Sequence, residues 1–200
     1  MRGSMMSHAR IAVFRGPGLP FQIEDRALPE AVGPGEVLVS VRLATVCGSD
    51  LRTADGQRHE PVPSVLGHEG VGQVVSVGSG RTDCAVGDRV TWTRADSCGS
   101  CAACTEWDLP QKCHRLFKYG HAALANGTGL NGCYASHVLL RPGTVVVRVS
   151  EGLPDALVAP ANCALATMMA AVEGLTPTCR LAVVRAAGLL GIYRAGNRVG

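Results

Sequence analysis

Four cysteines lie close together in the middle of the chain, in the segment CGSCAACTEWDLPQKC. Cys98, Cys101, Cys104 and Cys113 give the spacing C-x2-C-x2-C-x8-C. Three thiolates spaced three residues apart can converge on one point, and a fourth can return to it after a short loop. This closed set of sulfur ligands predicts a structural zinc ion that folds the loop. An iron–sulfur cluster and unrelated core cysteines remain as alternatives.

Three other residues could form a second, open metal site. Cys47 and His68 each follow a predicted strand, in CGSD and GHEG, and Cys163 stands in APANCALAT, where a helix is expected to start. Two sulfurs and one imidazole nitrogen are a ligand set of catalytic zinc, which keeps a fourth position for water or substrate. Taken singly, each cysteine could instead be a small core residue, and the histidine could be a turn residue.

Polar residues beside these ligands favour the metal interpretation. Asp50 and Glu69 are carboxylates of the kind that orient a metal-bound histidine. Ser49 carries a hydroxyl two residues from Cys47, where it could relay a proton. We therefore take Ser49, Asp50 and Glu69 as candidate catalytic residues.

Short strands must position these side chains. EVLVSVRLATV alternates, with Val37, Val39, Val41 and Leu43 expected on one face. Further strands are predicted in GVGQVVSVGSG, VGDRVTW, YASHVLL and TVVVRVS, separated by turns rich in Gly, Pro and Asn. This pattern predicts a barrel or a sandwich. From residue 155 onward, DALVAPANCALATMMAAVEGL predicts a helix with Pro160 near its start, and CRLAVV predicts a strand after it.

The composition excludes several functional classes. The chain has 200 residues, 46 % of them hydrophobic, which allows one domain and part of a second. A net charge of +3 from scattered cations argues against a nucleic-acid partner. No apolar run approaches the roughly 20 residues of a membrane span. Residues 1–8 lack a signal-peptide pattern and are set aside as a tag or disordered segment, so a cytoplasmic location is expected.

The segments ATVCGSD, LGHEGVGQVVSVG and VGDRV, with the cysteine quartet after them, resemble the zinc-dependent medium-chain alcohol dehydrogenases in this order. In that family a GroES-like barrel carries the catalytic residues and a Rossmann domain binds NAD or NADP. The resemblance implies a mainly β fold with some α. Residues 9–155 would form the GroES-like zinc-binding catalytic domain. Residues 156–200 would form a linking helix and an incomplete Rossmann segment.

The resemblance also implies roles for single residues. Cys47, His68 and Cys163 match the catalytic zinc ligands and the quartet matches the structural ones, which gives two zinc ions per chain. Ser49 matches the hydroxyl that passes the alcohol proton outward, and Asp50 matches the carboxylate that supports the ligand histidine. The implied substrate is a small alcohol or aldehyde.

Two features refine this resemblance. LPQKCHRLFKYGH resembles a subgroup linked to phosphonate metabolism, which implies a substrate that can bear a phosphonate. The family often has a histidine after CGSDL, but this chain has Arg52, which cannot serve as a general base. Arg52 is expected to be either solvated, the favoured interpretation, or a group that attracts an anionic substrate.

The last residues resemble the start of a dinucleotide-binding loop. AAGLLG offers Gly188 and Gly191 as candidate cofactor-binding residues, but Ala186 replaces the first glycine of the fingerprint. IYRAGNRVG, which follows, is a poor helix former. The acidic partner of the ribose, expected about 20 residues later, is not in the sequence. A truncated cofactor domain that binds NAD or NADP weakly is therefore expected.

Three functions stay open at this point. The first is zinc- and nicotinamide-dependent alcohol oxidation. The second is a non-catalytic zinc-binding remnant or interaction domain, in which the strand RLAVVR pairs with another chain, for example in a homodimer. The third is hydrolysis by zinc-bound hydroxide.

Overall fold

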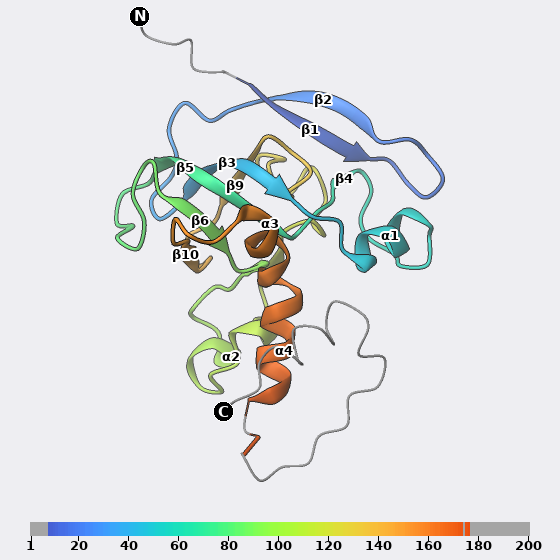
Figure 1. Cartoon of the computed structure of the whole chain (residues 1–200). Helices are drawn as coiled ribbons and strands as arrows, with labels where there is room; N and C mark the ends of the chain where they lie inside the picture. The colour runs from blue at the N-terminus through green and yellow to red at the C-terminus, as the bar shows by residue number, and fades with distance from the viewer. Residues whose placement is uncertain (1–7, 174, 177–200) are drawn as a thin grey trace, which may run out of the picture.

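Two antiparallel sheets form the body of the molecule in the computed structural model, which describes residues 8–173 and 175–176. The larger sheet has the strand order β10-β6-β5-β3-β9 and lies at the centre of the view in Figure 1. Its strands are β3 (Val37–Ala44), β5 (Gly70–Val77), β6 (Arg89–Trp92), β9 (His137–Leu140) and β10 (Val146–Arg148). These are the five strands that the sequence predicted.

A smaller sheet with the order β2-β1-β4 crosses the larger one (Figure 1). It consists of β1 (His8–Phe14), β2 (Gln22–Ala27) and β4 (Ser64–Val65), so the first strand starts at the last residue of the segment set aside as a tag. A bridge between Ile11 and Ala135 links β1 to the segment that enters β9. The sequence analysis did not identify β1 and β2, whereas β4 falls in the strand that it predicted before His68.

The first three residues of β3 are buried, because side chains on its two faces pack into two different core clusters. Val37 and Val39 belong to a core cluster with Trp92, and Leu38 belongs to a second cluster with Ile11. The expected alternation therefore holds for the first half of the strand. A register shift follows Val41, and Leu43 packs instead against the cluster of Val71, Val158 and Ala159. Valine and leucine at these positions suit a strand covered on both sides.

Helices lie at the ends of the strands. They are α1 (Gly48–Ala54), α2 (Ala102–Thr105), the 3-10 turn η1 (Pro110–Lys112), α3 (Asp155–Val158), the 3-10 turn η2 (Ala159–Asn162) and α4 (Ala164–Val172). A short ladder of β7 (Ala95–Asp96) and β8 (Phe117–Lys118) flanks α2 and η1 in the sequence. Figure 1 shows α2 and α4 on the same side of the barrel.

The helix predicted from residue 155 onward is broken into three pieces. Pro160 lies inside the 3-10 turn η2, since proline has no N–H with which to continue an α-helix. Cys163 stands at the break before α4. In the described part of the chain no single helix is long and apolar enough to cross a membrane. The two helical segments on either side of Cys163, Asp155–Asn162 and Ala164–Val172, reach that length and apolar composition only when they are taken together, and the chain bends by 55° between them. The predicted strand CRLAVV and the residues Gly188 and Gly191 lie outside the described residues.

Candidate functional site

The residues of the predicted open site come from three separate segments. Cys47 follows β3 and is the N-cap of α1. His68 and Glu69 lie between β4 and β5, so a turn between strands of the two sheets carries them. Cys163 stands between η2 and α4. Because η2 packs against β5, β3 and β6, the broken helix brings Cys163 back to the same end of the barrel.

The structure brings these side chains to one place. One ligand atom from each of Cys47, His68, Glu69 and Cys163 lies within 4.8 Å of the other three. His68 and Glu69 are almost fully buried, at 1 % and 2 % exposure. Two thiols, one imidazole and one carboxylate in such a cluster match the donor types of zinc. The donor set therefore fits a metal ion, and Glu69 is one of its four possible donors.

Asp50 faces the imidazole ring of His68. Its Oδ1 lies 3.4 Å from His68 Nδ1, and both atoms are buried without a hydrogen bond among the described residues. Asp50 Oδ2 accepts hydrogen bonds from the backbone N–H of Cys47 and from the hydroxyl of Tyr134, each 3.0 Å long. Burial raises the pKa of Asp50, but the contact with His68 and these hydrogen bonds outweigh it, so the pKa stays below its usual value.

The acidic groups of the cluster lie so close together that, without a cation, they disfavour one another's anionic forms. Burial, then the nearby Cys47 and Glu69, raise the pKa of Cys163 to about 12. The Glu69 carboxylate accepts a hydrogen bond of 2.6 Å from Thr45 Oγ1, which fixes its direction. Acidic groups held this closely together favour binding of a cation, which releases the proton of the thiol.

The other residues predicted near this site are placed as follows. Ser49 is the second residue of α1 and is half-buried, but no hydrogen bond of its hydroxyl is found in the described part of the chain. Arg52 lies in the last turn of α1 and is exposed.

Sequence reasoning missed two aromatic side chains at this site, those of Tyr134 and His121. The ring of His121 contacts the ring of His68, with centroids 4.9 Å apart. Neither residue stands at a short, regular sequence distance from a proposed metal ligand, because the tertiary fold brings both residues to the site.

The cysteine quartet forms a second cluster around α2. The four sulfurs lie within 4.8 Å of one another. Cys101 Sγ is 3.6 Å from Cys104 Sγ and 3.9 Å from Cys113 Sγ. A tetrahedron with zinc–sulfur bonds of about 2.3 Å has edges of about 3.8 Å, so these separations fit a four-sulfur zinc site.

Local structure around the quartet follows from its sequence. Cys101 is the N-cap of α2, and Cys113 directly follows η1, which Pro110 begins. The backbone N–H groups of Cys98 and Arg115 each donate to Cys113 Sγ over 3.3 Å. Hydrogen bonds from the backbone and side chain of Ser100 lower the pKa of Cys98 to about 5. N–H groups aimed at sulfur suit thiolates, which are the zinc-binding form.

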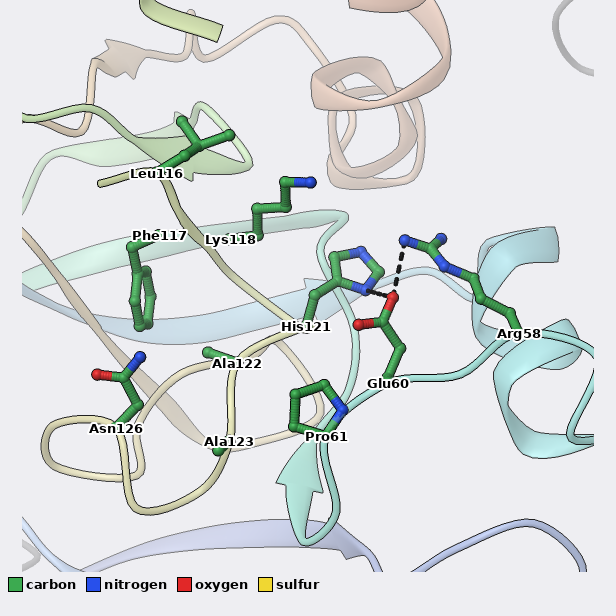
Figure 2. Close-up of a pocket in the computed structure, with 10 residues that line it drawn as sticks. All are labelled: Arg58, Glu60, Pro61, Leu116, Phe117, Lys118, His121, Ala122, Ala123 and Asn126. Atoms are coloured by element: carbon green, nitrogen blue, oxygen red, sulfur yellow. Dashed lines mark ion pairs between the residues drawn. The ribbon is translucent and has the colours of Figure 1, made fainter. Parts of the chain in front are cut away.

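His121 is one of the residues that line a pocket of about 440 Å³ (Figure 2). His121 Nδ1 lies 3.1 Å from Glu60 Oε1, and the same oxygen lies 2.8 Å from the Arg58 guanidinium. Burial, and then the charges of His68 and Arg58, lower the pKa of His121 to about 3, so its ring is neutral near pH 7. Lys118 also lines the pocket (Figure 2). Apolar surface from Phe117 and Ala122 completes the wall.

Comparison with known proteins shows similarity to alcohol dehydrogenases. The model of the alcohol dehydrogenase GroES-like domain matches residues 33–151. The 5-exo-hydroxycamphor dehydrogenase of Pseudomonas putida is 33 % identical over 80 % of this chain and 45 % of its own length. An L-threonine 3-dehydrogenase of Chelativorans is 35 % identical over 66 % of this chain and 37 % of its own length.

Solved structures show the same similarity. An alcohol dehydrogenase from Thermotoga maritima matches with a TM-score of 0.83 and 30 % identity, covering 94 % of this chain and 53 % of its own. The acetophenone reductase of Geotrichum candidum, in complex with NAD, matches with a TM-score of 0.78 and 27 % identity, covering 96 % of this chain and 55 % of its own. The chain thus spans about half the length of these proteins, or less. With its GroES-like domain and its two cysteine-containing clusters, the chain belongs to the zinc-dependent medium-chain alcohol dehydrogenase family.

Proposed function

We propose that this chain supplies the zinc-binding catalytic half of an NAD- or NADP-dependent dehydrogenase that interconverts a small alcohol and its carbonyl product. The observation that carries the proposal is the convergence of Cys47, His68, Glu69 and Cys163 within 4.8 Å. Zinc bound there would act as a Lewis acid that lowers the pKa of an alcohol oxygen, and a nicotinamide would accept the hydride.

The protein's own residues divide the remaining work. Cys47, His68 and Cys163 would hold the metal. The Glu69 carboxylate lies close enough to these three donors to bind the metal as well. Asp50, fixed by Tyr134 and by the N–H of Cys47, would keep the His68 ring in its orientation. Ser49, at the start of α1 near the donors, would accept the proton released by the alcohol.

The quartet would have a structural role. Four sulfurs leave no free coordination position for a substrate. Zinc held there would stabilise the fold of the loop between β7 and β8. The strand β8 consists of Phe117 and Lys118, and both residues line the pocket.

Cobalt substitution tests the open site directly. With Co²⁺ in place of zinc, adding an alcohol should change the visible absorption of the metal, because a free position accepts the ligand. The change should vanish in Cys47→Ala and persist in Cys84→Ala, a buried cysteine outside both clusters. An alcohol-induced change that survives Cys47→Ala would contradict the assignment.

Nicotinamide reduction tests the chemistry. Zinc-loaded protein is incubated with a panel of alcohols and NAD or NADP, and the absorbance of the reduced nicotinamide is followed. We expect any such signal to require Cys47 and His68. A signal that Cys47→Ala leaves undiminished would place the reaction elsewhere.

A further inference from the structure

The segment that carries Cys163 to the open cluster is tied to the larger sheet at two points. At its start, Asp155 lies between two arginines of that sheet. Its Oδ2 is 2.9 Å from Arg42 Nε on β3, and its Oδ1 is 2.8 Å from the Arg89 guanidinium on β6. Arg89 also donates a hydrogen bond of 2.7 Å to the carbonyl oxygen of Leu153. These contacts fix the place where α3 begins, before the chain reaches Cys163.

The second point is Asn162, the residue directly before Cys163. Its side-chain Nδ2 donates a hydrogen bond of 3.2 Å to the carbonyl oxygen of Trp92, the last residue of β6. The paired part of β5 and β6 ends at Gly72 and Val90, so Trp92 lies beyond that ladder. The amide of Asn162 therefore supplies a partner for a strand carbonyl at the end of the sheet where the open cluster lies.

The end of β6 is also tied to the turn that carries the other donors. Thr91 Oγ1 donates a hydrogen bond of 2.9 Å to the carbonyl oxygen of Gly70, which directly follows Glu69. A Cβ on Gly70 would lie 3.3 Å from the ring of Trp92, so this ring packs closely over the start of β5. Two neighbouring residues of β6 therefore connect the turn before β5 with the residue before Cys163.

General stability is a poor explanation for an asparagine at this position. The Oδ1 atom of Asn162 is buried and has no hydrogen-bond partner in the part of the chain that the structure describes. A buried oxygen without a partner offsets much of what the bond from Nδ2 contributes to stability. An apolar side chain of the same size would avoid that cost. What asparagine offers instead is a directional bond, and this favours a role in fixing the position of the backbone.

We propose that Asn162 is a positioning residue of the open metal site, which holds the backbone before Cys163 so that the thiol meets the other three donors of the cluster. The proposal rests on the proposed function, because it takes Cys163 as a metal ligand. A cysteine thiol is one bond beyond Cβ and has few rotamers, so its position follows the backbone closely. Residues that orient a metal ligand change the metal affinity by about ten- to a hundredfold.

Zinc affinity tests the role of the amide. Asn162→Leu keeps the approximate size of the side chain and removes its donor, so it should weaken zinc binding at the open site about tenfold and leave the quartet unchanged. Asn162→Gln keeps an amide donor and should weaken binding less. Gln73→Leu is the matched control, because it also removes a side-chain amide on the larger sheet that donates to a backbone carbonyl, that of Gly87. Competition with a chromogenic chelator measures the affinities, and equal losses in Asn162→Leu and Gln73→Leu would overturn the proposal.

Cobalt spectra separate positioning from general stability. A thiolate bound to Co²⁺ gives a charge-transfer band, and the quartet contributes equally to this band in every variant. At saturating Co²⁺, the band of Asn162→Leu should weaken toward that of Cys163→Ala, because the thiol no longer reaches the metal. If Asn162→Leu does not fold, Asn162→Ala, which adds no bulk, is measured in the same way. A band as strong as in the wild type, or loss of metal from the quartet as well, would contradict the positioning role.

The outcome separates this proposal from the proposed function. A cobalt band that requires both Cys163 and Asn162, without nicotinamide reduction by any alcohol, would leave the positioning role in place and contradict the dehydrogenase. Nicotinamide reduction that Cys47→Ala abolishes, with unchanged zinc affinity in Asn162→Leu, would leave the dehydrogenase in place and remove the positioning role. A wild-type band that Cys163→Ala does not weaken would contradict both.

Discussion

The hydroxyl of Tyr134 donates a 3.0 Å hydrogen bond to Oδ2 of Asp50, from a position 84 residues away in the sequence. Asp50 in turn faces His68, so a tyrosine on the approach to β9 helps to orient a proposed metal ligand. Hydrogen-bonded partners of this kind tune the affinity of a metal site.

Tyr134→Phe should therefore weaken zinc binding at the open site by about tenfold and leave the quartet unchanged. Competition with a chromogenic chelator measures the two affinities. Tyr119→Phe is a matched control, because it also removes a buried tyrosine hydroxyl, one that bonds Thr144. Equal losses at the open site in both variants would show that the hydroxyl of Tyr134 acts only through general stability.

Zinc binding at the open site should weaken as the pH falls. Burial and the neighbouring Cys47 and Glu69 raise the pKa of the Cys163 thiol to about 12, so zinc must displace a proton from it at any neutral pH. Each displaced proton makes the logarithm of the affinity rise by about one for each pH unit. Cys163→Ala should lower the slope of log affinity against pH by about one. An unchanged slope would mean that Cys163 does not bind the metal.

Gly67→Ala should distort the turn that carries His68. Gly67 has φ +88°, and an added Cβ would lie 2.6 Å from the ring of Tyr134. Positive φ and this clash together should cost about 2–4 kcal/mol in the free energy of unfolding. Gly80→Ala is the control for φ alone, because Gly80 has φ +80° and nothing within 4 Å of the added Cβ.

Denaturant unfolding of both variants gives the comparison. Gly80→Ala should lose about 1 kcal/mol, from strain without a clash. Equal losses in the two variants would show that Tyr134 can move aside and that the turn tolerates a side chain.

The quartet should matter more for folding than the open site does. The loop between β7 and β8 has one fully buried residue in α2, Ala103, so packing alone stabilises it little and metal binding must contribute. Cys104→Ser should increase the rate of trypsin cleavage after Lys112 or Arg115 by about tenfold or more. Cys84→Ser, in the core outside both clusters, should leave this loop protected. Protection of the loop in Cys104→Ser would contradict a structural role for the metal.

Much of the central sheet could be predicted from the sequence. β3, β5, β6, β9 and β10 all have valine-rich segments bounded by turns, and both cysteine clusters converge as the ligand types suggested. Of the smaller sheet only β4, the strand before His68, was predicted. β1 was not named, and β2 (QIEDRA) is an exposed, largely polar strand that carries no periodic apolar signal.

The parts of the site that were missed depend on contacts between distant segments. His121 reaches His68, and Tyr134 reaches Asp50, only after the strands have paired. The prediction of a single long helix from residue 155 was wrong. It gave more weight to the helix propensity of the alanine- and leucine-rich segment than to the interruption at Pro160 and Cys163. In the folded chain the break at these residues is what directs Cys163 to the cluster. The binding role of Gly188 and Gly191 stays a prediction, since both lie outside the described residues.

The metal content of the purified chain tests the open site most directly. Elemental analysis after loading with zinc and removal of the excess should give about two zinc ions per chain, one for each cluster. Cys47→Ala and His68→Ala should each give about one, while Cys84→Ala should still give two. A wild-type ratio of one that Cys47→Ala does not change would contradict the account, because only the quartet would then bind zinc.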